Sequence, residues 1–580
     1  MSDPILQNRV WSRMQAGVDE AEVVFRSGSG SAALCEGETA IGLFSADGHL
    51  LVEGSTSAPY QAALLRVWIQ AIQDRIDDGE GAWVSNDPYD GGGSICDLKM
   101  VAPVQTESGV LWVAVTGHYS DLGGKSVGGV APGARRIHEE GLRIPFSRLD
   151  EHLTELLSAN CRYAGVARQD LAAQKAALRA LAEWMSRLAD IHGWGAIDET
   201  CVSVYERAVN ARVKACRDLT EGVYVRRDRL DADVDVNAAT SIKLTLGVEG
   251  SGLVFDFEGT GAQAAGPSNC TYASTIAAIL CGLRQIFPEI PACGFGIDGL
   301  EIRVPHGSLL NAVYPAAVGG TFDVVGERVS SVVIEALSQA VHGRGKACDG
   351  GGGNVIVIES DAREQAFALR LVVGSGGGAS GRGDGLSNSD PANRLSDFPS
   401  IEAIERTLPV RVIRHAEREG SGGAGRYRGG EGTVFEIASL KRQARLSVYA
   451  DRYRRGAGGH HRGSRGQTAE IQIHTNGHWQ VPENRGRSQD IGLDFGDRVR
   501  IATAGGGGYG HPYERAIRLV SEDVTSGRLS RTDAAKRHGV VFTSDSASDY
   551  DSGKTFKLRS YRLTSSDVDD FLDEIEALED

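Results

Sequence analysis

Residues 40–52 read AIGLFSADGHLLV, and this stretch decides what kind of sheet the chain builds. Two apolar runs, Ala40–Phe44 and Leu50–Val52, stand on either side of Ala46-Asp47-Gly48. An Asp-Gly pair between apolar runs is typical of a β-hairpin, because both residues tolerate the backbone of a tight turn. The stretch therefore predicts antiparallel strands, and it is the first support for the α+β fold class that we predict.

More strands are predicted downstream, and a glycine-rich loop lies between two of them. The runs Ala82–Ser85 and Met100–Val104 have strand character, and the second is expected to pair with Val110–Val115. Upstream, Asp3–Arg26 has the apolar spacing of a helix. We interpret the loop Asn86–Asp97, which separates the first two strands, as a functional loop.

Later segments change between helical and strand patterns. From Gln169 to His192 the apolar residues fall three, four or seven positions apart, which indicates an amphipathic helix, and Thr200–Leu219 is predicted as a second. Residues Val223–Phe257 alternate as a half-buried antiparallel sheet does. Further predictions are a helix at Gly326–Ala340, short strands after Val373 as far as Ile501, and tail helices at Tyr513–Ser526, Arg531–His538 and Ser565–Glu576.

At 580 residues the chain exceeds the usual size of one hydrophobic core, so several packed subdomains are expected. We predict mixed and antiparallel sheets, a helical insertion and a β-rich C-terminal region. The expected regions are an N-terminal α+β region with Gly-rich site loops (1–158), the helical insertion (159–222), a central α+β region (223–372), a β-rich Gly-loop region (373–512) and a helical C-terminal tail (513–580).

Charge and cysteine content exclude several classes of protein. The net charge of −16 argues against a nucleic-acid or anionic-membrane surface, since both favour clustered Lys and Arg. The first residues lack the basic start and apolar run of a secretory signal, so we expect a cytoplasmic protein. Nine scattered cysteines without a C-x-x-C pair indicate reduced thiols rather than disulfides or a structural zinc site.

Candidate site residues come from two motifs. In NDPYDGGGSICD, the glycines let the backbone approach a ligand or metal closely, and Asp87, Asp90 and Asp97 supply carboxylates; an acidic surface turn is the alternative. His118 stands at the end of an apolar strand, where His118 and Asp97 could be metal ligands or an acid/base pair. A structural histidine is the alternative there.

Other glycine-rich motifs do not indicate nucleotide binding. Residues 122–126 end like a phosphate-binding P-loop, but its first glycine would fall at Tyr119. The runs Gly374–Gly385, Gly420–Gly432 and Gly505–Gly508 lack the context of a dinucleotide-binding unit, so we interpret them as turns or packed loops. The chain also has no G-x-S-x-G, H-E-x-x-H or C-x-x-C motif of a self-sufficient hydrolase.

Seven segments in order resemble one family over roughly residues 1 to 545. They are LFSADGHLL (43–51), NDPYDGGG (86–93), HYSDLGG (118–124), IHEEGLRIPFSRL (137–149), NAVYPAAVGG (311–320), GSGGAGRYRGGEG (420–432) and AGGGGYGHP (504–512). The chain is similar to the B-type subunits of the hydantoinase/5-oxoprolinase/acetone carboxylase family. The resemblance implies a hydantoinase B-like fold with several subdomains.

The resemblance also implies a function as one subunit of a heteromeric ATP-dependent enzyme. An A-type partner would bind ATP and phosphorylate the amide oxygen of a hydantoin, oxoproline or lactam ring, and the B-type subunit would supply water at a metal centre. The alternatives are a subunit of an acetone- or acetophenone-type carboxylase, and a catalytically silent structural subunit. The substrate is a small molecule, and neither nucleic acid nor membrane is expected.

The resemblance places the metal ligands at Glu38, Asp97 and His118, with Asp97 and His118 also as the catalytic pair. Zinc, manganese or iron would lower the pKa of a bound water. Three positions depart from the family pattern, in which histidines are expected: Ser94, Gln61 and Tyr119. These departures leave few ligands for a catalytic zinc, which takes about three from the protein.

Overall fold

The predicted hairpin forms β1 (Thr39–Phe44) and β2 (Leu50–Glu53) at one edge of a six-stranded antiparallel sheet. The strand order is β2-β1-β5-β4-β3-β6. The computed structural model describes residues 3–560 except 77–80, 108, 130, 234–239, 298, 342, 361–366, 390–392, 395–396 and 544–548. The other strands of this sheet are β3 (Trp83–Ser85), β4 (Asp97–Gln105), β5 (Val110–His118) and β6 (Ser147–Arg148).

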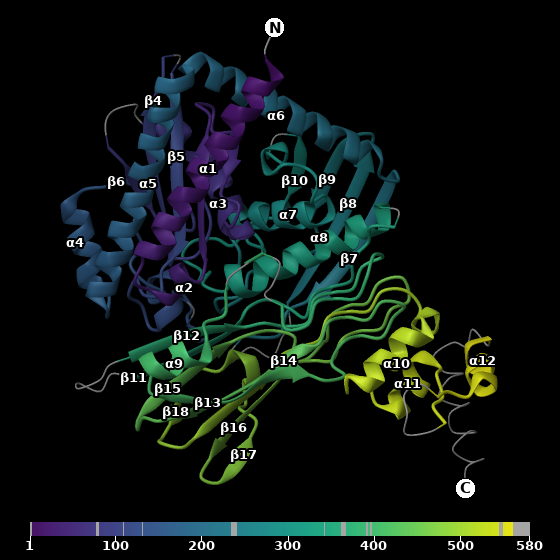
Figure 1. The fold of residues 1–580 in the computed structure, drawn as a ribbon. Coiled ribbons are helices and arrows are strands. Elements are labelled where there is room, and N and C mark those ends of the chain that lie inside the picture. Colours follow the sequence, from purple (N-terminus) through teal and green to yellow (C-terminus); the bar gives the residue numbers. More distant parts are fainter. Residues whose placement is uncertain are drawn as a thin grey trace.

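Helices cover both faces of this sheet, because successive side chains of a strand point to opposite faces. Ile41 and Val113 pack on one face with α1 and α5, whereas Ala40 and Trp112 pack on the other with α3 (Figure 1). The helices of this part are α1 (Pro4–Gly28), α2 (Ala32–Cys35), α3 (Pro59–Ile72), α4 (Glu151–Asn160), α5 (Ala164–His192) and α6 (Trp194–Arg217).

A second sheet, in the order β10-β9-β8-β7, packs against α8 in the central part of the chain. Its β9 and β10 are parallel and its other neighbours are antiparallel, so the sheet is mixed as predicted. The elements are β7 (Gly222–Arg229), β8 (Ser241–Glu249), β9 (Gly252–Asp256), β10 (Leu300–Arg303), α7 (Tyr272–Ile286), the π-helical turn η5 (Thr321–Gly326) and α8 (Glu327–Ala340).

The C-terminal part contains two more sheets that share one apolar core (Figure 1). Their orders are β12-β11-β15-β18 and β13-β14-β19-β16-β17. The strands are β11 (Asn354–Ser360), β12 (Phe367–Val373), β13 (Val410–Arg418), β14 (Gly432–Ser439), β15 (Ala444–Tyr449), β16 (Glu470–Thr475), β17 (His478–Gln480), β18 (Ile491–Leu493) and β19 (Arg498–Ala502). The predicted α+β class with a β-rich C-terminal region is confirmed.

The remaining helices are short. They are α9 (Ile401–Thr407), α10 (Ile517–Thr525), α11 (Arg531–His538), α12 (Ser552–Ser560) and the 3₁₀ turns η1 (Gln73–Arg75), η2 (Val127–Gly129), η3 (Ile137–Glu139), η4 (Ala292–Gly294), η6 (Arg485–Arg487) and η7 (Pro512–Glu514). The helix predicted at Ser565–Glu576 lies outside the described residues. No described helix combines the length and apolar character needed to cross a lipid bilayer.

Two buried helices, α3 and α7, have no counterpart among the predicted elements. Nearly every residue of each is buried, so neither has the polar face that produces a helical period in the sequence. Strands β4 and β5 are also longer than predicted, and they extend to Asp97 and His118. Both candidate site residues are therefore part of the sheet.

Glycine makes up 75 of 580 residues because several loops pack backbone against backbone. Gly506 N–H donates to Gly430 O at 3.0 Å, and Gly430 N–H donates to Gly377 O at 2.8 Å, so three loops are joined in series. A Cβ at Gly430 or Gly506 would overlap a carbonyl oxygen of a neighbouring loop. Figure 1 shows these loops in green, running side by side. The prediction of packed loops is confirmed.

Replacing a glycine in this contact tests the packing. We expect Gly430→Ala to lower the free energy of unfolding by about 3 kcal/mol, because the added methyl group forces two backbones apart. Gly383→Ala is the matched control, since a Cβ there meets no atom within 4 Å. Thermal unfolding of both variants measures the difference, and equal midpoints would contradict direct backbone packing at Gly430.

Candidate active site

Asp97 and His118 face one another on adjacent strands. Asp97 begins β4 and His118 ends β5, and the antiparallel register pairs the two residues directly. The Nδ1 atom of His118 lies 2.8 Å from Oδ1 of Asp97, and both side chains are buried. The structure therefore brings together the two predicted catalytic residues as an ion pair or strong hydrogen bond.

The surroundings of Asp97 keep it ionised. Burial alone would raise its pKa, but His118, the backbone N–H of Ser94 and the amide of Gln61 together lower it to about 2. Gln61 Nε2 donates to Oδ1 at 2.7 Å. A carboxylate at this position orients the imidazole with its Nδ1–H toward Asp97, so the lone pair of His118 is on Nε2. Nε2 lies 3.4 Å from the carbonyl oxygen of Gly128.

Glu38 is close to this pair, but its carboxylate serves other partners. The backbone N–H of His118 donates to Glu38 O at 2.9 Å, which places the two residues side by side. The Glu38 carboxylate accepts hydrogen bonds from Arg370, at 2.7 Å, and from Arg394. Both guanidiniums also pair with Asp323 of η5, where Arg370 Nη2 lies 3.5 Å from Oδ1. All four side chains are buried.

Arg394 stays charged at the centre of this four-residue network. Its burial lowers its pKa to about 9, which still leaves the guanidinium protonated at neutral pH. The same group stacks on the ring of Phe322, with Cζ 4.7 Å from the centroid. The fixed positive charges beside Asp97 and His118 are therefore two arginines.

The residues present do not fit the metal site that the family resemblance implies. Among the described residues, no three histidine, cysteine, aspartate or glutamate side chains are arranged to hold a metal ion. Glu38 is bound to guanidiniums, and Asp97 and His118 bind each other. At the departing positions, Gln61 bonds Asp97, the Ser94 hydroxyl is buried, and Tyr119 donates to Gln174 of α5 at 2.6 Å.

The glycine-rich loop lies directly above the pair, although two of its acids have structural roles. Asp90 pairs with Arg75 at 2.7 Å, and Asp87 accepts from the N–H of Tyr89. Arg143 lies 3.7 Å from Asp87, as expected for a structural salt bridge. These contacts favour the structural alternative for both acids.

Lys99 is a buried neighbour that the motifs did not reveal. Its Nζ donates to the Gly92 carbonyl at 2.8 Å, and burial lowers its pKa to about 8. The alternation of β4 was the available signal, because it places Lys99 on the same face as Asp97.

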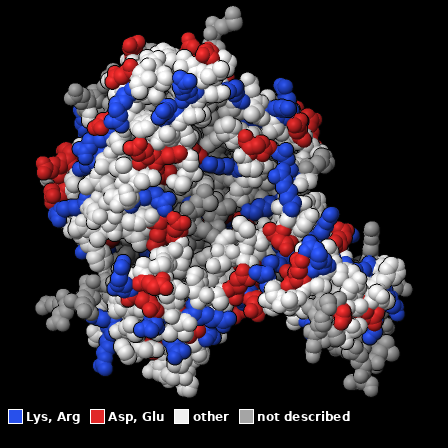
Figure 2. Space-filling model, viewed as in Figure 1, with Lys and Arg blue, Asp and Glu red and all other residues white. Residues whose placement is uncertain are grey.

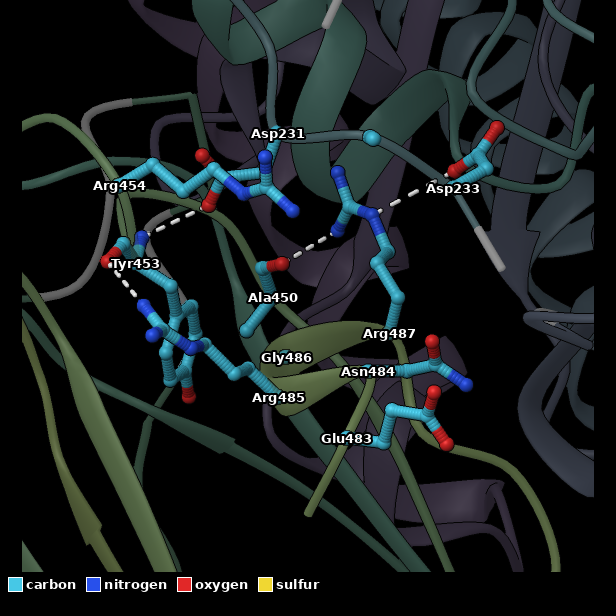
Figure 3. A pocket seen from close by; sticks show the side chains of 11 residues that line it. Asp231, Asp233, Ala450, Tyr453, Arg454, Glu483, Asn484, Arg485, Gly486 and Arg487 are labelled. Atoms are coloured by element: carbon cyan, nitrogen blue, oxygen red, sulfur yellow. Dashed lines mark hydrogen bonds and ion pairs between the residues drawn. The ribbon is translucent and has the colours of Figure 1, made fainter. Parts of the chain in front are cut away.

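Three cavities are close enough to the site or large enough to consider as ligand sites. The largest, about 750 Å³, has Arg370 in its wall, and one of about 180 Å³ reaches Glu38. A third, of about 360 Å³, is polar and lies away from the His118–Asp97 pair. Figure 3 shows that its Arg487 points to Asp233, at 3.4 Å, and to the carbonyl of Ala450. The cavity with Arg370 is therefore the best candidate for substrate.

Comparison with known proteins now identifies the chain. The family model described as hydantoinase B/oxoprolinase matches residues 3–512. The chain belongs to this family. The B component of a D-/L-hydantoinase from Pseudomonas sp. (strain NS671) is 26% identical over 546 residues, which is 88% of this chain and 90% of that protein.

Two solved structures have the same fold as this hydantoinase B family member. The ATP-dependent caprolactamase from Pseudomonas jessenii has a TM-score of 0.85 at 24% identity, covering 96% of this chain and 99% of that chain. Nucleotide-free acetone carboxylase also has a TM-score of 0.85, at 18% identity, covering 96% and 82%. The likeness confirms the hydantoinase B-like fold, and it fits amide hydrolases and carboxylases equally.

Removing one arginine of the network tests how strongly the buried charges depend on each other. We expect Arg394→Met to lower the free energy of unfolding by about 3–5 kcal/mol, because Glu38 and Asp323 lose their shared cation. Arg344→Met is the control, since its pair with Glu289 is exposed and worth less than about 1 kcal/mol. Denaturant titration measures both, and equal effects would show that the network adds no stability.

Metal analysis tests the centre itself. We expect less than one equivalent of zinc, manganese or iron in protein purified with its A-type partner, and no change in Asp97→Asn, because arginines engage Glu38. Near-stoichiometric metal that disappears in Asp97→Asn would show instead that Glu38 exchanges its arginines for the ion.

Proposed function

We propose that this chain is the B-type subunit of an ATP-dependent cyclic amide hydrolase and works in a heteromeric complex with an A-type, ATP-binding subunit. Membership of the hydantoinase B/oxoprolinase family over residues 3–512 supports this proposal. The observation that carries it is the buried pair of His118 and Asp97, at 2.8 Å, because it is a base held in one orientation by a carboxylate. We also propose a cytoplasmic location.

The pair supplies the proton transfers of ring opening. After the partner has phosphorylated the amide oxygen, Nε2 of His118 accepts a proton from water while the water oxygen bonds to the ring carbon. The ring C–N bond then breaks, and the nitrogen takes the proton back from His118. A second water releases phosphate from the resulting acyl phosphate. Asp97 holds the imidazole throughout and stabilises its protonated form.

The surface of the chain is consistent with a small-molecule substrate. Figure 2 shows Lys, Arg, Asp and Glu interspersed over the viewed face, without a continuous basic area. Nucleic acids and anionic membranes bind to clustered positive charge, so neither is part of the proposed function.

The complex with the A-type subunit provides the test. With ATP and a cyclic amide, we expect His118→Gln and Asp97→Asn each to lower kcat by about 100-fold or more, because each removes part of the oriented base. His152→Gln is the matched control, since His152 is exposed on α4. Rates of ring opening and of phosphate release measure the effect.

Two other outcomes would replace the proposal. Turnover of a ketone with bicarbonate, and none of any cyclic amide, would identify a carboxylase subunit, whose fold this chain shares. Unchanged ring opening in both variants, with an intact complex, would identify a structural subunit without catalytic residues.

A further inference from the structure

The cavity of about 750 Å³ lies between the N-terminal part of the chain and the β-rich part. Segments from α2, from the loop after β5, from the start of α5, from β12 and from α9 form its walls (Figure 1). Much of the lining is hydrocarbon, contributed by Val127, Val166, Ala167, Leu371, Ile404 and Leu408. Such a wall binds an apolar body and gives little to a charged one.

Arg370 connects this cavity to the candidate active site. It lines the cavity, and its side chain is only 4% exposed. Gly128 separates it from His118: the Gly128 carbonyl lies 3.4 Å from His118 Nε2, and a Cβ at Gly128 would press on Arg370 Cδ. A group bound at Arg370 is therefore next to the proposed base.

One donor of Arg370 remains for a ligand. Its two terminal nitrogens bond Glu38 and Asp323. Its Nε–H is buried and has no acceptor among the residues that the structure describes. A buried donor without an acceptor is costly, and an oxygen of a bound molecule would satisfy it.

Carboxylates also surround the cavity. Glu36, Asp121 and Asp170 are among its lining residues. Asp170 accepts from the backbone N–H groups of Gly30, at 2.7 Å, and Ser31, at 3.0 Å, rather than from a cation. A carboxylate on the body of a ligand would lie in an apolar wall beside these acids, which disfavours it.

We propose that this cavity binds cyclic amides whose ring carries hydrocarbon and no carboxylate, with the amide oxygen directed toward Nε of Arg370. The proposal rests on the proposed function and adds the substrate class. It predicts that the neutral ring of caprolactam is accepted and that 5-oxoproline, which has a carboxylate, is rejected.

The complex with the A-type subunit tests the location through a cavity-filling variant. Ala167→Phe places a ring inside the cavity from α5, and we expect it to raise KM for caprolactam about tenfold or more with little change in kcat. Ala172→Phe is the control, because Ala172 is exposed on the same helix. Arg370→Lys keeps a cation but removes the Nε–H, and we expect it to weaken caprolactam binding.

Charge selection is tested with Asp170→Asn, whose amide oxygen can still accept from Gly30 and Ser31. We expect this variant to gain binding of 5-oxoproline without losing caprolactam. A direct binding measurement, ligand-observed NMR with each compound, separates this inference from the proposed function, since it needs no turnover.

Three results would overturn the inference. They are preference of the natural chain for 5-oxoproline, equal KM values in Ala167→Phe and Ala172→Phe, and no binding of either compound by NMR. Binding of caprolactam that Ala167→Phe abolishes, without any ring opening, would support the cavity and contradict the proposed function.

Discussion

The arrangement of the candidate site depends on how four buried charges are balanced. Glu38, Asp323, Arg370 and Arg394 come from the N-terminal segment, the turn before α8, β12 and the loop after it. Taking charges out of water costs several kcal/mol each unless they are paired with good geometry. The network can therefore exist only when these distant segments are correctly packed against one another.

This balance determines what the site beside it can do. Because Arg370 and Arg394 occupy the carboxylate of Glu38, that residue is not available as a ligand in the arrangement observed. Asp97 is left to orient His118, and the resulting pair is the main chemical resource of the chain. Arg370 also reaches the large cavity, so one side chain links charge balance, ligand binding and proton transfer.

The glycine loops solve a different problem, which is how to connect the parts. Side chains normally keep backbones apart, and these loops use glycine to let one backbone hydrogen-bond directly to the next. Gly377, Gly430 and Gly506 form one such series. The close contact brings residues from three distant segments into one rigid layer, at the cost of a composition that tolerates few substitutions.

Local patterns in the sequence determined much of the fold and part of the site. Asp-Gly predicted the hairpin of β1 and β2, and apolar spacing predicted α5, because the periods of strands and amphipathic helices are local properties. Only the tertiary structure showed α3 and α7, since helices buried on all sides have no period to detect.

The site divides in the same way. Asp97 and His118 could be paired from the sequence, because they are the ends of two neighbouring strands. Arg370 and Arg394 could not, since they lie more than 300 residues from Glu38 and no local pattern relates them. The sequence by itself thus determined the elements and the catalytic pair. Only the packing of distant segments decided which charges meet and where the cavity lies, because contacts between distant segments follow from the whole fold.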